Sequence, residues 1–130
     1  MLALSDGRGR FAAAPAPSAA ANARAAQFLD YDGDGLLDLF LLTTGGPRLL
    51  RNVGREWTDV TAQAIPAAMT SALAKATSLA SGDLNGDGRV DVIAEGPAGL
   101  TIWQNSGPSR ATSLRVNLCL LYTSPSPRDS

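Results

Sequence analysis

An acidic nine-residue segment occurs twice in the chain, and its residue types are those of a metal site. The copies are DYDGDGLLD at residues 30–38 and DLNGDGRVD at residues 83–91, which start 53 residues apart. Each copy places oxygen-bearing side chains at positions 1, 3, 5 and 9, with glycine at positions 4 and 6. Ca²⁺ prefers about six to eight oxygen ligands, and short carboxylates on a tightly curled loop supply them. The spacing therefore predicts one calcium site in each copy.

The predicted ligands are the side chains at positions 1, 3, 5 and 9 and the main-chain carbonyl at position 7. Because only the carbonyl is used at position 7, the side chain there is expected to matter little. The glycines allow the positive-φ bends by which a backbone wraps an ion. The predicted calcium ligands are Asp30, Asp32, Asp34, Leu36 and Asp38 in the first copy and Asp83, Asn85, Asp87, Arg89 and Asp91 in the second.

The distribution of charge supports this prediction. The two segments hold seven of the twelve acidic residues, whereas the basic residues are scattered along the chain. Several carboxylates in one small loop repel one another, and a bound divalent cation removes that repulsion. A solvated Asp-Gly turn is the simpler alternative for a single copy, and two copies in register make it the weaker interpretation.

The EF-hand is a closer alternative, because its calcium loop shares positions 1, 3, 5, 6, 7 and 9. That loop ends in a bidentate Glu at position 12, where this chain has Leu41 and Ala94. The segments after the loops, residues 39–42 and 92–94, are short apolar runs of the kind that form buried strands. An EF-hand or dockerin-like module would have a helix after each loop instead.

The repeat extends beyond the acidic segments. Residues 4–11 align with residues 50–57 at an offset of 46, and each stretch predicts a strand, a glycine-containing turn and an aromatic residue that opens another strand. A partial third copy occupies residues 103–107. A period of about 50 residues with several short strands per unit is typical of a β-propeller or a similar array. The sequence therefore predicts an all-β fold.

Alanine-rich connectors occupy the same place in each repeat, at residues 12–26 and 61–76. Their prolines argue against continuous helices, because proline removes a backbone donor and clashes with the preceding turn. Residues 67–76, after Pro66, leave room for a turn or two of helix. Trp57 and Trp103 are assigned to matching repeat positions and are expected to pack between blades; stacking on sugar rings is the alternative.

These residues resemble the FG-GAP or VCBS repeats of integrin-alpha-like β-propellers. The resemblance rests on residues 28–40, 51–61 and 81–93 and covers residues 1 to about 117. Within that family the chain is similar to the bacterial branch with a C-terminal ASPIC/UnbV segment and to cartilage acidic proteins, with residues 114–118 as the opening of that segment. The resemblance implies four-stranded antiparallel blades, Ca²⁺ in the loop between the first two strands, and a secreted, periplasmic or cell-surface protein.

The chain is shorter than a closed propeller, which needs at least four blades, so we expect a fragment of about two. The expected parts are a truncated blade with its connector at residues 1–24, calcium-loop blades at 25–74 and 75–117, and a non-native tail at 118–130. The tail continues no repeat element and resembles a translated sequencing adapter, with a natural Ser/Pro-rich tail as the alternative. It contains Cys119, the only cysteine, so no disulfide is expected.

Composition gives little support for catalysis or nucleic-acid binding. The chain has no histidine, no nucleophile elbow and no phosphate-binding glycine loop, and its basic residues form no stripe. No apolar run is long enough to span a membrane. We therefore expect a non-catalytic scaffold or binding module that presents loops to a protein or glycan ligand beside the remaining blades of the parent chain. The alternative is an accessory propeller domain of a larger extracellular hydrolase.

Overall fold

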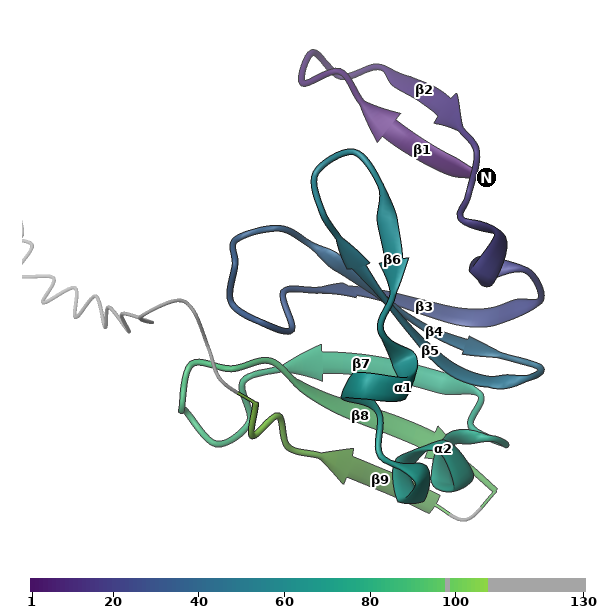
Figure 1. Ribbon diagram of the computed structural model, residues 1–130, viewed down its shortest axis with the longest axis vertical. Helices are drawn as coiled ribbons and strands as arrows, with labels where there is room; N and C mark the ends of the chain where they lie inside the picture. The colour runs from purple at the N-terminus through teal and green to yellow at the C-terminus, as the bar shows by residue number, and fades with distance from the viewer. Residues whose placement is uncertain (98, 108–130) are drawn as a thin grey trace, which may run out of the picture.

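The computed structural model describes residues 1–97 and 99–107, and they fold mostly into antiparallel β-sheet, as predicted (Figure 1). The strands are β1 (Leu2–Ser5), β2 (Phe11–Ala14), β3 (Ala23–Leu29), β4 (Asp38–Thr43), β5 (Gly46–Asn52), β6 (Trp57–Asp59), β7 (Ser78–Gly82), β8 (Asp91–Gly96) and β9 (Gly99–Trp103). The helical segments are the 3₁₀ turn η1 (Ser18–Ala20) and the helices α1 (Thr61–Ala64) and α2 (Ala67–Leu73). The strands form sheets of two, four and three strands.

The four-stranded sheet has the order β3-β4-β5-β6, and each strand pairs antiparallel with the next along the chain. All six residues of β4 are buried. Phe40 and Leu42 face one side of the sheet, whereas Leu39 and Leu41 face the other. This double burial explains why the run after the first acidic loop is continuously apolar rather than alternating.

The three-stranded sheet has the order β7-β8-β9 and repeats the first three strands of the larger sheet. Both acidic loops have the same place in these sheets. Residues 30–37 join β3 to β4, and residues 83–90 join β7 to β8. Because strands rather than helices follow the loops, the EF-hand or dockerin-like alternative is wrong.

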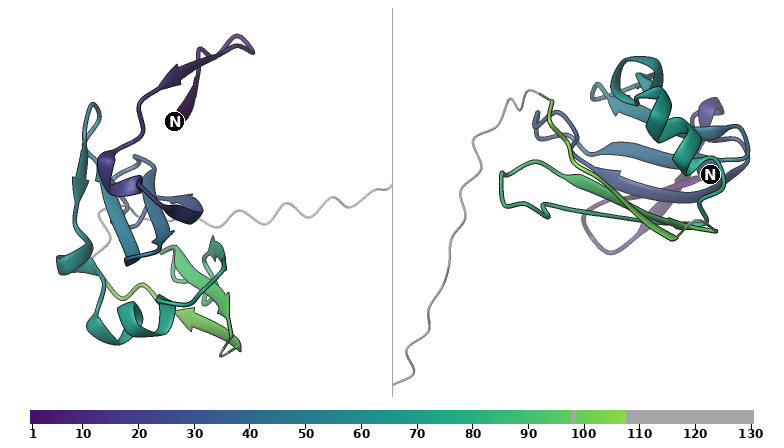
Figure 2. Two further views of the ribbon diagram at one scale, coloured as in Figure 1. Left: turned by 90° about the vertical axis from the view of Figure 1, so that its right-hand side faces the viewer. Right: turned by 90° about the horizontal axis from the view of Figure 1, so that it is seen from below.

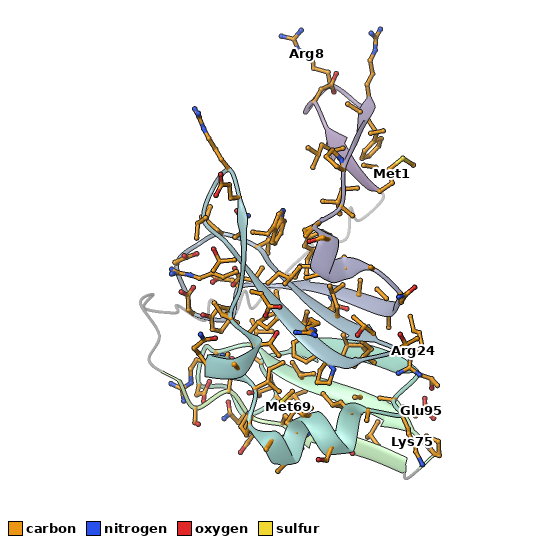
Figure 3. All side chains as sticks on the ribbon, turned by 45° about the vertical axis from the view of Figure 1, so that its right-hand side comes forward. Met1, Arg8, Arg24, Met69, Lys75 and Glu95 are labelled. Carbon is orange, nitrogen blue, oxygen red and sulfur yellow. The ribbon has the colours of Figure 1, made fainter. Side chains whose placement is uncertain are left out.

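The second connector folds into α1 and α2, which lie beside the two larger sheets (Figure 1). Pro66 stands immediately before α2, whose seven residues confirm the expected turn or two of helix. Arg24 of β3 ties the end of this connector to the sheet, since its Nη2 donates to the carbonyls of Ala74 at 3.1 Å and Thr43 at 3.2 Å. Figure 3 shows Arg24 at the same end of the molecule as Lys75 and Glu95.

The main core lies between the two larger sheets and is closed by the helices. Met69 and Leu73 of α2 pack there with residues from both sheets, and Figure 3 shows Met69 on the helix beside the sheets. The buried members of this cluster are Leu29, Phe40, Leu42, Leu49, Ile65, Met69, Leu73, Ala76, Val92 and Ala94. A smaller cluster of Leu39, Leu41 and Leu50 covers the opposite face of the four-stranded sheet.

The two tryptophans pack against these clusters from different places in the repeat. Trp57 opens β6 after a turn and packs against the smaller cluster, with its ring centroid 6.5 Å from that of Phe28. Trp103 ends β9 and packs against the main cluster. It stands two residues before Asn105, as Leu50 stands two residues before Asn52, so Trp103 matches Leu50 in the repeat and not Trp57. Their assignment to matching positions is therefore wrong, although both contribute to core packing.

The hairpin of β1 and β2 stands apart from the other sheets (Figures 1 and 2). Its strand, turn and aromatic-led strand confirm the pattern expected from its alignment with β5 and β6. Leu4 and Phe11 are largely exposed on it. The hairpin joins the rest of the molecule through the first connector and η1.

Residues 108–117, the ASPIC/UnbV-like residues 114–118, the tail at 118–130 and Cys119 lie outside the described residues. Among the residues that are described, no helix combines the length and the apolar character needed to cross a bilayer.

Replacing Leu42 by alanine tests the packing of the main core. Leu42 is 0 % exposed, so Leu42→Ala leaves a cavity and is expected to lower the free energy of unfolding by about 2–5 kcal/mol. Urea denaturation measures this change. Leu100→Ala is the matched control, because Leu100 is 67 % exposed and its truncation should change the stability by less than about 0.5 kcal/mol. Equal effects of the two substitutions would contradict this core.

Candidate metal centres

Both acidic loops project from the same end of their sheets, at the left of Figure 1 and again at the left of the right-hand view in Figure 2. This arrangement follows from the topology. Each loop joins the first strand of a sheet to the second, and the first strands β3 and β7 lie against each other. The repeat in the sequence thus becomes a repeat in space.

The first loop brings three of its predicted ligands together. Carboxylate oxygens of Asp30, Asp32 and Asp38, one from each residue, lie within 4.8 Å of one another. Calcium–oxygen distances are about 2.3 to 2.6 Å, so ligands on opposite sides of an ion are separated by about 5 Å. Oδ1 of Asp32 is buried and has no hydrogen-bond partner. The spacing and this unsatisfied oxygen both fit a calcium ion.

Hydrogen bonds within the first loop hold its curl. Oδ1 of Asp30 accepts the N–H of Asp34 at 3.1 Å, and Oδ2 accepts the N–H of Gly35 at 3.0 Å. Gly33 and Gly35 have φ values of 71° and 86°, a region that favours glycine. At position 7 the N–H of Leu36 donates to Oδ1 of Asp34 at 2.9 Å, while its side chain is partly exposed.

Asp38 is the fully buried member of the first site. Its Oδ2 accepts the N–H of Tyr31 at 3.1 Å, and its Oδ1 accepts the N–H of Asn52 at 2.8 Å. Burial raises the pKa of Asp38, and the charges of Asp32 and Asp34 add to this effect, while the two backbone N–H groups oppose it. A raised pKa means that the surroundings disfavour its negative charge, which a nearby cation would stabilise.

Asp34 is the predicted ligand that the structure places elsewhere. It is not part of the group formed by Asp30, Asp32 and Asp38, and its Oδ2 lies 2.9 Å from Nη2 of Arg51. The same nitrogen lies 2.8 Å from Oδ2 of Asp32. Arg51 lies beside the loop because it is the penultimate residue of β5, which pairs with β4, the strand that follows the loop. Its guanidinium supplies positive charge beside Asp32 and Asp34.

The second loop has a closely similar hydrogen-bond pattern. Oδ1 of Asp83 accepts the N–H groups of Gly86 at 2.7 Å and Asp87 at 3.1 Å, and its Oδ2 accepts that of Gly88 at 3.0 Å. The N–H of Arg89 donates to Oδ1 of Asp87 at 2.9 Å, as Leu36 donates to Asp34 in the first loop. The two loops therefore have the same curl.

The charges in the second loop are arranged differently. Nδ2 of Asn85 donates to Oδ2 of Asp87 at 2.8 Å, and Nη2 of Arg89 donates to the same oxygen at 2.6 Å. The pKa of Asp87 is lowered, mainly by the hydrogen bond from the backbone N–H of Arg89. The hydrogen bond from the Asn85 amide and the positive charge of Arg89 lower it further. Within residues 1–97 and 99–107, the first loop alone presents a group of three carboxylates, since Asn85 replaces the acid at position 3.

Asp91 repeats the role of Asp38 at position 9. It is fully buried, its Oδ2 accepts the N–H of Leu84 at 3.0 Å, and its Oδ1 accepts the N–H of Asn105 at 2.8 Å. The separations along the chain are the same in both repeats, seven residues to the loop donor and fourteen to the asparagine. Each position 9 carboxylate thus connects its loop to the end of the third strand.

The two asparagines were not predicted as part of the site. The side chain of Asn52 donates to the carbonyl of Leu37 at 3.1 Å within its own sheet, whereas that of Asn105 donates to the carbonyl of Tyr31 at 2.7 Å in the first loop. Asn105 therefore connects the two sheets directly at the metal loops. The signal in the sequence is the Asn-x-Gly motif, found at residues 52–54 and again at 105–107.

The two acidic loops and the strands around them match a known protein family. A family model described as the FG-GAP-like repeat matches residues 30–94, which is half of the chain. The chain belongs to the FG-GAP-like repeat family. No curated protein and no solved structure matches it. The matched segment begins at position 1 of the first loop and ends within β8, so it includes both acidic loops.

Asn105→Ala tests the connection between the sheets. The substitution removes the donor to Tyr31 and the acceptor of the Gly107 N–H, and it keeps the backbone N–H that binds Asp91. We expect the free energy of unfolding to fall by about 1–3 kcal/mol, because the hydrogen bond from Asn105 to the Tyr31 carbonyl is lost. The neighbouring Gln104 is exposed, so Gln104→Ala should change it by less than about 0.5 kcal/mol. Urea denaturation that does not separate the two variants would contradict this role.

Proposed function

We propose that this FG-GAP-like repeat is a calcium-stabilised structural and binding module with one calcium ion in each acidic loop. The observation that carries the proposal is the convergence of Asp30, Asp32 and Asp38, whose oxygens are spaced for a single ion around one fully buried carboxylate. An all-oxygen set of short acidic side chains is the donor chemistry that Ca²⁺ prefers. The repeated hydrogen bonding of the second loop extends the proposal to that loop.

The ligands that we propose are the predicted ones. Asp30, Asp32 and Asp38 are already close together, and Asp34 would complete the first site by turning away from Arg51. The proposed ligands are the side chains of Asp30, Asp32, Asp34 and Asp38 with the Leu36 carbonyl, and those of Asp83, Asn85, Asp87 and Asp91 with the Arg89 carbonyl. Calcium would supply the positive charge that buried carboxylates at position 9 need.

The role of the ion in this proposal is structural. Asp38 and Asp91 each hold a loop and the end of the third strand by main-chain N–H groups. An ion bound to the same carboxylates would fix the bend between the first two strands. It would also stabilise the link from Asn105 to Tyr31, because Tyr31 lies within the first loop.

The family supports the setting that we propose. FG-GAP-like repeats are typical of extracellular proteins, which supports a secreted, periplasmic or cell-surface location. We propose that loops at the end of the sheets that carries the acidic segments face a protein or glycan ligand. We also propose that the chain has no catalytic centre of its own, since it has no histidine and its clustered carboxylates are spaced for chelation.

We also propose how the three sheets correspond to blades of a β-propeller. The sheet β3-β4-β5-β6 would be one blade, β7-β8-β9 would be three strands of the next, and the hairpin β1-β2 would correspond to the last two strands of a preceding one. The alignment of residues 4–11 with residues 50–57 supports this placement of the hairpin. Membership of the ASPIC/UnbV branch and a non-native origin of the tail at 118–130 stay proposals from sequence.

A calcium titration of the unfolding transition tests the proposed function. A ligand that binds only the folded state stabilises it by RT ln(1 + [L]/Kd), or about 2.7 kcal/mol per site at 100 times Kd. Extracellular modules bind Ca²⁺ at about 10⁻⁴ to 10⁻³ M, so the titration should run to about 10 mM. We expect the urea midpoint to rise with Ca²⁺ and to rise less with Mg²⁺, which demands a tighter octahedral shell.

Single substitutions assign the effect to the loops. Asp32→Ala and Asp87→Ala should each remove the contribution of one site. Leu36→Ala should leave its own site intact, because only the backbone carbonyl is used at position 7. A midpoint that does not move at millimolar Ca²⁺, or that moves equally in Asp32→Ala and Leu36→Ala, would contradict the proposal.

A further inference from the structure

Arg51 occupies a position for which the calcium proposal alone does not account. Its Nη2 lies 2.8 Å from Oδ2 of Asp32 and 2.9 Å from Oδ2 of Asp34, and the three side chains are 14 to 25 % exposed. An arginine guanidinium is always protonated in proteins, so Arg51 carries a fixed positive charge. A tethered cation is thus in contact with two of the four carboxylates of the first loop.

This contact is also incomplete. A single nitrogen serves both carboxylates, and Nε of Arg51 is buried without a hydrogen-bond partner. Strong arginine–carboxylate pairs use two parallel N–H donors instead. The other carboxylate oxygen of Asp32, Oδ1, has no hydrogen-bond partner. Asp32 is also a member of the carboxylate group that it forms with Asp30 and Asp38. Asp32 is therefore shared between the arginine and the proposed metal position.

The second repeat lacks this arrangement. Gln104 takes the place of Arg51, one residue before the asparagine that binds the position 9 carboxylate, and it is exposed. The arginine of the second loop, Arg89, lies within the loop itself, where its Nη2 pairs with Oδ2 of Asp87 at 2.6 Å and its Nε donates to the carbonyl of Asn105 at 2.7 Å. An arginine that reaches the loop from the third strand is thus a property of the first repeat.

We propose that Arg51 is a built-in counter-cation that competes with Ca²⁺ for Asp32 and Asp34, so that the first loop exchanges its guanidinium for the metal. This inference rests on the proposed calcium function. When calcium is scarce, Arg51 limits the repulsion among the carboxylates and preserves the loop. When calcium binds, Asp34 leaves Arg51 to join the other three acids, and this exchange weakens the affinity of the first site.

The test uses Arg51→Gln, which installs the residue type found at the matching place of the second repeat. The full chain carrying Asp87→Ala, with a single proposed site remaining, is titrated with CaCl₂ by calorimetry, with and without Arg51→Gln. We expect Arg51→Gln to tighten calcium binding roughly tenfold, the scale of one lost charge-assisted contact. In EDTA the same substitution should lower the urea midpoint, because the carboxylates lose their counter-cation.

Two further variants distinguish competition between Arg51 and Ca²⁺ from an effect of removing any positive charge from β5. Arg51→Lys keeps the charge but loses the planar guanidinium, so its calcium affinity should lie between that of the parent chain and that of the Arg51→Gln variant. Arg48→Gln is the matched control on the same strand, since Arg48 pairs with Asp59 at 3.3 Å on the surface and its replacement should leave calcium affinity unchanged.

The outcomes distinguish the two proposals. Calcium binding that is unchanged or weaker in Arg51→Gln would overturn the role of Arg51 while leaving the calcium function intact. Absence of binding in every variant would overturn calcium binding by the first loop and, with it, the role of Arg51. If Arg51→Gln does not fold in EDTA, Arg51→Lys decides the matter, since an affinity equal to that of the parent would contradict competition.

Discussion

Two fully buried carboxylates, those of Asp38 and Asp91, set the constraint on which both larger sheets depend. Each is the first residue of a central strand and accepts one N–H from the acidic loop and another from the asparagine at the end of the third strand. A carboxylate removed from water needs such donors, because an unpartnered buried charge is costly. The loop, the second strand and the third strand are therefore positioned together by one side chain in each repeat.

Neutral N–H donors satisfy these oxygens but do not cancel their charge. In the first loop Asp30 and Asp32 add negative charge beside Asp38, and a nearby cation would stabilise this charge. Arg51 supplies part of the compensating positive charge from a neighbouring strand, and we propose that Ca²⁺ supplies the rest. Because Asn105 binds the carbonyl of Tyr31, the state of the first loop bears directly on the contact between the sheets.

Much of the fold could be predicted from sequence, because its signals are local. The acidic loops, the buried strand β4 and the short helix after Pro66 follow from spacing, apolar runs and proline chemistry within a few residues. The partners of position 9 could not be predicted in this way, since Asn52 and Asn105 lie fourteen residues away and meet Asp38 and Asp91 only through strand pairing. The contacts of Arg51 with the first loop depend on the same pairing. The two tryptophans were misaligned because aromatic type alone does not fix the register of a repeat.

We propose that the first acidic loop is a calcium cage built around Asp38. The most direct measurement is a crystal structure of the protein grown in CaCl₂, with an anomalous difference map collected at long wavelength. We predict an anomalous peak in contact with carboxylate oxygens of Asp30, Asp32 and Asp38, at distances of about 2.3 to 2.6 Å. A well-ordered first loop with no peak among these oxygens would contradict the account.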